Sequence, residues 1–187
     1  IIGSAQMYIV EGYPLTAQLL SAYKTMLNAA LNDGVKLALS SGYRDPFKNI
    51  IASDGTFIST AQYELRRQNV KDKSKKSDDS WLRTASSKSF DPETARPGYS
   101  NHNSGIAIDL NCKGAKFGGV VFPIYEWLVL NAYKFGFVRT VTSEEWHWEY
   151  RPGKAMFQYD ARDGKKWYGL PDKLGIPLNK PEETVAS

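Results

Sequence analysis

A single cysteine, Cys112, is the feature that most narrows what this 187-residue chain can fold into. One cysteine forms no internal disulfide and excludes CxxC metal sites, so the fold must depend on a hydrophobic core. Hydrophobic residues make up 42% of the chain and charged residues 24%, the composition of a globular protein, and the length suits one domain over 1–187. No run approaches the roughly 18 apolar residues that a membrane span requires.

The positive charge of the chain is local. The net charge is +4, but residues 66–88 contain eight basic and three acidic residues, so the rest of the chain carries about −1. We interpret the run at 71–80 as a solvated loop, with attraction to a polyanion such as nucleic acid or an acidic wall polymer as the alternative. No zinc-finger spacing, RNP-like motif or Arg-rich helix favours nucleic acid.

Hydrophobic periodicity predicts the main elements. Apolar spacing predicts a helix over 15–31, ended by Gly34, and Pro123 begins another that Gly136 ends near 135. Ser59 and Gln62 suggest a capping box for a helix over 59–69. Alternation predicts four strands, which lie at 35–39, 106–110, 137–141 and 146–150. Residues 71–98 are expected to be loop, and 153–187 an irregular C-terminal segment.

The only two histidines, His102 and His147, lie in different settings. His102 precedes the 106–110 strand, in which Ile106 and Ile108 would face the core and Asp109 the opposite side. In the 146–150 strand, alternation places His147 and Glu149 on one face and the aromatic residues on the other. Two imidazoles and a carboxylate are the ligands of many catalytic zinc sites. Taken singly, each His could equally be a packed core residue, and Asp109 a buried carboxylate or a cap.

Four motifs read in order resemble one family. The pattern SxHxxGxAxD is matched from Ser100 to Asp109, ExWH from Glu144 to His147, and SGYR from Ser41 to Arg44, with ARPG at 95–98. The sequence resembles the zinc D-alanyl-D-alanine carboxypeptidases of the VanY type (peptidase family M15), which share a fold with the hedgehog signalling domain. The resemblance, over about 15–152, implies an α+β fold: a small, mainly antiparallel sheet with helices packed on one side.

The resemblance also implies roles for individual residues. His102, Asp109 and His147 would bind Zn²⁺. Glu144 would be the general base that returns its proton to the leaving amine. Arg44 would hold the polarised carbonyl oxygen or a substrate carboxylate; otherwise it is a surface turn residue.

Several neighbouring residues leave alternatives open. Strand alternation would favour Glu145 as the base, although a turn at 142–145 would remove that argument. Glu149 is either a partner of the metal site or a surface charge. Cys112 could be a soft metal ligand or a small buried thiol.

Substrate-contacting residues depart in part from the family pattern. Asn49 stands where a Gln is common, and Asn101 and Asn103 flank His102. Ser100 either hydrogen-bonds near the site or shapes the loop. We expect Asn49 and Ser100 to contribute to substrate binding together with Arg44.

The expected activity is zinc-dependent hydrolysis of an amide bond in peptidoglycan stem peptides, as a D,D- or L,D-carboxypeptidase. The alternatives are an endopeptidase cutting between L-Ala and D-Glu or within a cross-bridge, and a non-catalytic zinc-stabilised binding module. The partner would be a stem peptide or muropeptide, with no nucleic acid, and the protein a monomer. Its substrate implies the periplasm, the cell wall or secretion, although the start of the chain at Ile1 lacks a signal-peptide pattern.

Overall fold

The computed structural model describes residues 7–70, 94–116, 118–141 and 144–152. These fall in two compact units: unit one comprises 1–17 and 42–106, and unit two 18–41 and 107–187. The single domain over 1–187 stays a prediction. The run at 71–80, the rest of the basic segment 66–88 beyond residue 70, most of the 71–98 loop and the segment 153–187 lie outside the described residues. Within the described ranges, no helix is long and apolar enough to cross a membrane.

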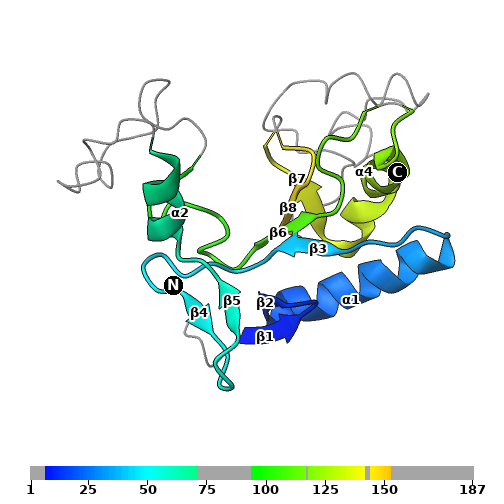
Figure 1. Ribbon diagram of the computed structural model, residues 1–187. Coiled ribbons are helices and arrows are strands. Elements are labelled where there is room, and N and C mark those ends of the chain that lie inside the picture. Colours follow the sequence, from blue (N-terminus) through cyan, green and yellow to red (C-terminus); the bar gives the residue numbers. More distant parts are fainter. Residues whose placement is uncertain (1–6, 71–93, 117, 142–143, 153–187) are drawn as a thin grey trace. The chain divides into compact units, whose positions relative to one another are not determined.

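Unit two contains a four-stranded antiparallel sheet (Figure 1). The order of its strands is β3-β6-β8-β7, with bounds Leu39–Ser41, Ala107–Leu110, His147–Tyr150 and Phe137–Arg139 respectively. The central pair β6–β8 aligns Ile108 with Trp148, and both side chains are fully buried. Three of the four predicted strands therefore form as expected, each slightly shorter than its periodic pattern.

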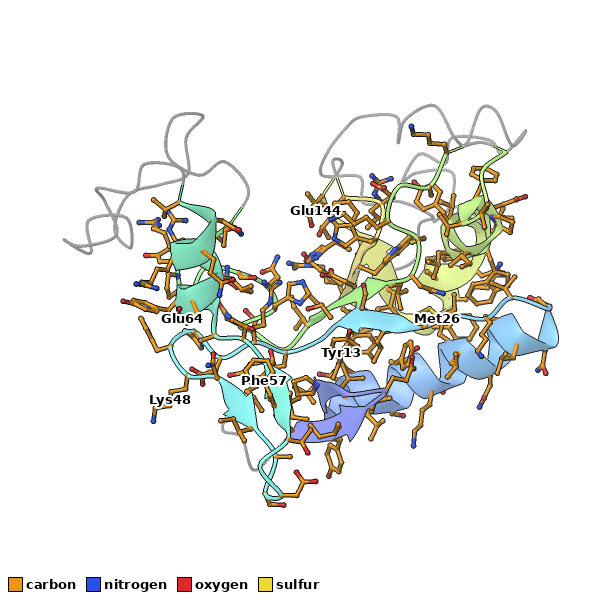
Figure 2. The ribbon with its side chains drawn as sticks, viewed as in Figure 1. Tyr13, Met26, Lys48, Phe57, Glu64 and Glu144 are labelled. Atoms are coloured by element: carbon orange, nitrogen blue, oxygen red, sulfur yellow. The ribbon has the colours of Figure 1, made fainter. Side chains whose placement is uncertain are left out.

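The helices of unit two supply the rest of its core. Helix α1 (Ala17–Asn32) buries Leu19, Tyr23, Met26 and Ala30, the spacing of one helical face (Figure 2 labels Met26). Helix α4 (Phe122–Asn131) continues into the 3-10 helix η3 (Ala132–Phe135). Gly136 ends it at φ 90°, as predicted. Mixed helices and an antiparallel sheet confirm the α+β class.

In its described residues, unit one contains two hairpins and one helix. Strands β1 (Met7–Val10) and β2 (Tyr13–Thr16) pair around a Glu11-Gly12 turn with positive φ angles. Strands β4 (Ile50–Ile51) and β5 (Phe57–Ser59) form the second hairpin, and α2 spans Gln62–Asn69. Neither hairpin is predicted by alternation, because strands of two to four residues carry too short a periodic signal.

Two local predictions are wrong. The strand predicted at 35–39 begins only at Leu39, because Ala38 and Lys36 bind the side chain of Asn111 through their backbones. The capping box is absent: α2 begins after Ala61, and the Ser59 hydroxyl donates to the Tyr43 carbonyl instead.

Long-range contacts replace the capping box at the start of α2. The carbonyls of Asp45 and Pro46 accept hydrogen bonds from the Gln62 and Tyr63 amides. Asn49 Oδ1 accepts from the Ala61 amide at 2.8 Å. These backbone donors are thus satisfied by a loop well before the helix in sequence, which local pattern does not encode.

Gly42 occupies a position with no room for a side chain. A Cβ built there would lie 2.4 Å from the Pro14 carbonyl oxygen, which accepts a hydrogen bond from the neighbouring Tyr43 amide. The obstacle is backbone rather than a flexible side chain, so the loop itself would have to move. The glycine of the SGYR motif is therefore required by close packing within unit one.

We predict that Gly42→Ala lowers the free energy of unfolding by about 1–3 kcal/mol, the usual cost of forcing a methyl group into filled space. Urea denaturation followed by circular dichroism measures the change. The exposed Ser53→Ala variant serves as the control and should leave the midpoint unaltered. An unchanged midpoint for Gly42→Ala would show that the loop relaxes without cost.

Candidate metal centre

The β6–β8 pairing brings Asp109 and His147 together in unit two. The two residues are register partners, and Asp109 Oδ1 lies 3.1 Å from His147 Nδ1. The imidazole is almost fully buried, with 5% of its residue surface exposed. Strands with this register hold both side chains on one face, so the sheet itself fixes their separation.

Glu144, labelled in Figure 2, precedes β8 and approaches the same nitrogen of His147. Its Oε2 lies 3.7 Å from His147 Nδ1, and the His147 amide donates to the Glu144 carbonyl. Glu145 accepts a hydrogen bond from the Gly114 amide instead. Residues 145–146 form a turn in which strand alternation does not apply, which is why Glu144 rather than Glu145 contacts the histidine. Residues 142–143 of the turn expected at 142–145 lie outside the described residues.

Glu149 lies on the opposite nitrogen of the same ring. Its Oε2 is 2.9 Å from His147 Nε2, and the residue is fully buried. Of the two interpretations that the sequence left open, a surface charge is excluded. The alternation predicted for 146–150 is confirmed, since His147 and Glu149 share a face.

The carboxylates around His147 change its acidity. Burial opposes the charged imidazolium, but hydrogen bonds to Asp109 and Glu149, with their negative charges, outweigh it and raise the pKa to about 9 from 6.5. In the metal-free protein the His147 ring therefore carries a proton on each nitrogen, and a positive charge, at neutral pH. Because folding raises this pKa, the protonated ring stabilises the metal-free fold below pH 6.5, and that contribution is lost as pH rises through about 9.

His102 lies in the loop that leads to β6 and belongs to unit one. Its Nδ1 is 2.8 Å from the Gly42 carbonyl oxygen, and its own carbonyl accepts from the Arg44 amide. A carbonyl can only accept, so the ring proton sits on Nδ1, and Nε2 carries the lone pair suited to a metal. The ring is 3% exposed.

Other predicted residues support this loop through hydrogen bonds. Ser100 Oγ accepts from the His102 amide at 3.2 Å, which shapes the loop. Asn103, which is buried, donates to the Arg44 carbonyl and accepts from the Gly98 amide. Asn49 joins the start of α2 through Ala61. The substrate-binding roles of Arg44, Ser100 and Asn49 stay predictions.

Further residues, absent from the motif analysis, hold the loop from α2. Gln62 donates to the Ala95 carbonyl at 2.8 Å, and the fully buried Arg66 donates to the Thr94 carbonyl. Asn69 donates to the Thr94 hydroxyl at 2.8 Å. The sequence gives only a weak signal for these roles, because polar residues on a short helix usually face water.

A cavity of about 410 Å³ opens beside Asp109 within unit two. Ser40, Asn111, Lys113 and Trp146 contribute to its wall, and the Lys113 ammonium lies 4.9 Å from the centre of the Trp146 ring. Cys112 is not part of this wall: it is fully buried, and its Sγ donates to the Glu145 carbonyl. Burial and the nearby Glu145 charge raise the pKa of its thiol to about 12, as in a buried thiol rather than a thiolate ligand.

The donor types fit a zinc ion. Among the described residues, His102, Asp109 and His147 form a group of ligand-type side chains that could hold a metal ion. His102 Nδ1 lies beside the Gly42 carbonyl, which leaves Nε2 as a ligand. His147 Nε2 lies beside Glu149, which leaves as a ligand Nδ1, the nitrogen beside the proposed ligand Asp109. Two imidazole nitrogens and one carboxylate oxygen leave a fourth tetrahedral position open.

We predict that His147 in the metal-free protein titrates with a pKa near 9, measured from its imidazole resonances by NMR. Zinc must displace the Nδ1 proton, so binding at pH 7.5 should release about one proton from this ring. Calorimetry in buffers of different ionisation enthalpy detects that release. A ring that titrates near 6.5, or heats of binding independent of buffer, would contradict the prediction.

Comparison with known proteins identifies the family of this chain. The family model described as VanY, D-alanyl-D-alanine carboxypeptidase, matches residues 13–153. A D-alanyl-D-alanine carboxypeptidase of Enterococcus faecalis is 30% identical over 135 residues, which are 67% of this chain and 44% of that protein. The chain thus spans less than half the length of this relative.

Solved structures share the fold. VanYB in complex with D-alanine-D-alanine matches with a TM-score of 0.55 at 22% identity, over 89% of this chain and 87% of that one. A VanY D,D-pentapeptidase mutant in complex with Zn(II) matches with 0.52 at 22%, over 96% and 88%. The LdcB L,D-carboxypeptidase matches with 0.55 at 19%, over 99% and 79%. With the family model matched across both histidine motifs, this chain belongs to the VanY family of D-alanyl-D-alanine carboxypeptidases.

Proposed function

We propose that this chain is a zinc-dependent carboxypeptidase that removes a C-terminal D-amino acid from peptidoglycan stem peptides. The observation that carries the proposal is the convergence of Asp109 and Glu144 on His147 Nδ1, at 3.1 and 3.7 Å, in a chain of the VanY family. A relative named for this activity and a fold relative bound to D-alanine-D-alanine support the substrate class.

His102, Asp109 and His147 would hold the ion. Zinc bound there supplies a Lewis acid for the scissile carbonyl and for the attacking water. A fold relative that binds Zn(II) supports this choice of metal. The paired imidazoles and the carboxylate favour zinc over Ca²⁺ or Mg²⁺, which prefer oxygen ligands throughout.

Glu144 would take the proton from the attacking water and return it to the leaving amine. Its carboxylate is 30% exposed, which gives it access to both water and substrate, whereas Glu149 is enclosed. Arg44 would bind either the carbonyl oxygen as it gains charge or the carboxylate of the substrate, since a guanidinium keeps its charge and presents paired donors. Ser100 and Asn49 would contribute to substrate binding together with Arg44.

Two other functions remain distinct candidates. An endopeptidase cutting between L-Ala and D-Glu, or within a cross-bridge, would use the same residues on a different bond. A non-catalytic zinc-stabilised module would have no use for Glu144 beside the ligand nitrogen, and that proximity favours an enzyme. The substrate places the site of action in the periplasm, the cell wall or outside the cell, and we expect a monomer there that binds no nucleic acid.

We predict that Glu144→Ala retains zinc and lowers kcat by about 10²–10⁴-fold, the contribution typical of a general base. Release of D-alanine from a pentapeptide and zinc content by atomic absorption are measured on the same samples. Glu145→Ala, which removes a carboxylate one residue away, is the matched control and should retain most of the turnover. Wild-type turnover by the Glu144 variant would disprove its assignment as the base.

The products identify the bond. We predict that mass spectrometry of muropeptides after digestion shows loss of one terminal alanine from pentapeptide or tetrapeptide stems. Cleavage between L-Ala and D-Glu would instead leave L-Ala on the glycan and release the rest of the stem peptide. Failure of the zinc-loaded protein to alter any muropeptide would favour the binding module.

A further inference from the structure

A carboxylate that the proposed reaction does not use lies at the centre of the sheet. Glu149 lies on β8 between β6 and β7, where Ala107 and Val138 are its register partners. The residue is fully buried. An ionised carboxylate in such a position costs several kcal/mol unless partners compensate for its lost hydration. Its partners therefore decide what it can do.

Three donors meet the two oxygens of Glu149. Thr140 Oγ1 donates to Oε2 at 2.6 Å, and Arg151 Nε donates to Oε1 at 2.7 Å. His147 Nε2 lies 2.9 Å from Oε2. A guanidinium and a hydroxyl both stabilise the ionised carboxylate, which accepts hydrogen bonds and donates none.

This arrangement determines which nitrogen of His147 keeps its proton. Since Oε2 only accepts, Nε2 must carry hydrogen, and Nδ1 is the nitrogen that faces the Asp109 and Glu144 carboxylates. A ring held with its proton on Nδ1 would instead turn a donor toward the position of the metal. Glu149 determines the tautomer of His147 and thereby keeps Nδ1 available to bind a metal.

We propose that Glu149, held in place by hydrogen bonds from Thr140 and Arg151, is a positioning residue that fixes the His147 ring and reserves Nδ1 for the metal. The inference rests on the proposed function, since it requires His147 to be a zinc ligand. Outer partners of ligand histidines commonly contribute 10–100-fold to metal affinity. Glu149 itself does not touch the metal or the substrate.

The decisive variant is Glu149→Gln, which keeps size and loses one acceptor. A carboxamide offers one oxygen to the three donors, so at least one of Thr140, His147 and Arg151 loses its acceptor. The charged Arg151 guanidinium attracts the remaining oxygen, which turns the amide nitrogen toward the ring and favours the Nδ1 proton. We expect the zinc dissociation constant, measured by chelator competition at pH 7.5, to rise 10–100-fold, while the melting temperature of the metal-free protein reports on folding.

Glu126→Gln is the matched control, because it makes the same chemical change elsewhere in unit two. Glu126 is a half-buried carboxylate on α4. Its zinc affinity should equal that of the wild type. Thr140→Val removes one donor to Glu149 without altering charge, and we expect it to weaken zinc binding by a smaller factor. Zinc binding by Glu149→Gln as tight as in the control would overturn the inference.

A measurement on the unaltered protein tests the same point if the variant fails to fold. Long-range proton–nitrogen NMR of the zinc-loaded wild type should show His147 with hydrogen on Nε2 and the shift of a metal-bound Nδ1. Binding through Nε2 would overturn the role of Glu149 while leaving the proposed function intact. Absence of zinc binding by the wild type would refute the proposed function itself.

Discussion

The register between β6 and β8 is the constraint on which the rest of the site depends. Asp109 and His147 face each other because Ile108 pairs with Trp148, and both members of that pair are fully buried. A slip of one residue would expose those apolar side chains and turn Asp109 and His147 to opposite faces. The hydrophobic core therefore sets the distance between two proposed ligands, and the polar site adds little to the choice of register.

Some of this could be predicted from the sequence because the signal is local. Alternation around Asp109 and His147 gave the two central strands and their faces, and Gly136 gave the end of η3. The hairpins of unit one and the start of α2 could not be found in this way. The strands of the two hairpins, two to four residues long, are too short to give a periodic signal. The start of α2 depends on a partner outside the helix, since the Ala61 amide donates to Asn49 Oδ1, and helix propensity has no information on such a partner.

The same distinction applies to the residues of the site. The motifs selected Glu144 over Glu145, and the turn before β8 explains the choice, since its geometry brings Glu144 to 3.7 Å from His147 Nδ1. Supporting residues escaped the sequence analysis because their type is uninformative. Thr140 resembles any strand threonine until its hydroxyl is found against the Glu149 oxygen. Gly42 is part of the SGYR motif, but only the close approach of the Pro14 carbonyl shows why a glycine is needed there.

Charge around His147 argues for a cation at this centre. Asp109 and Glu144 lie within 3.7 Å of Nδ1, and Glu149 lies within 2.9 Å of Nε2, so three carboxylates surround one imidazole. Arg151 compensates Glu149 from the far side, but it does not reach the Nδ1 side of the ring through any of its described contacts. In the metal-free protein the second ring proton of His147, whose pKa is raised to about 9, offsets part of this charge. A divalent ion bound at Nδ1 and Asp109 would replace that proton and supply one more positive charge, which is the balance that the buried carboxylates require.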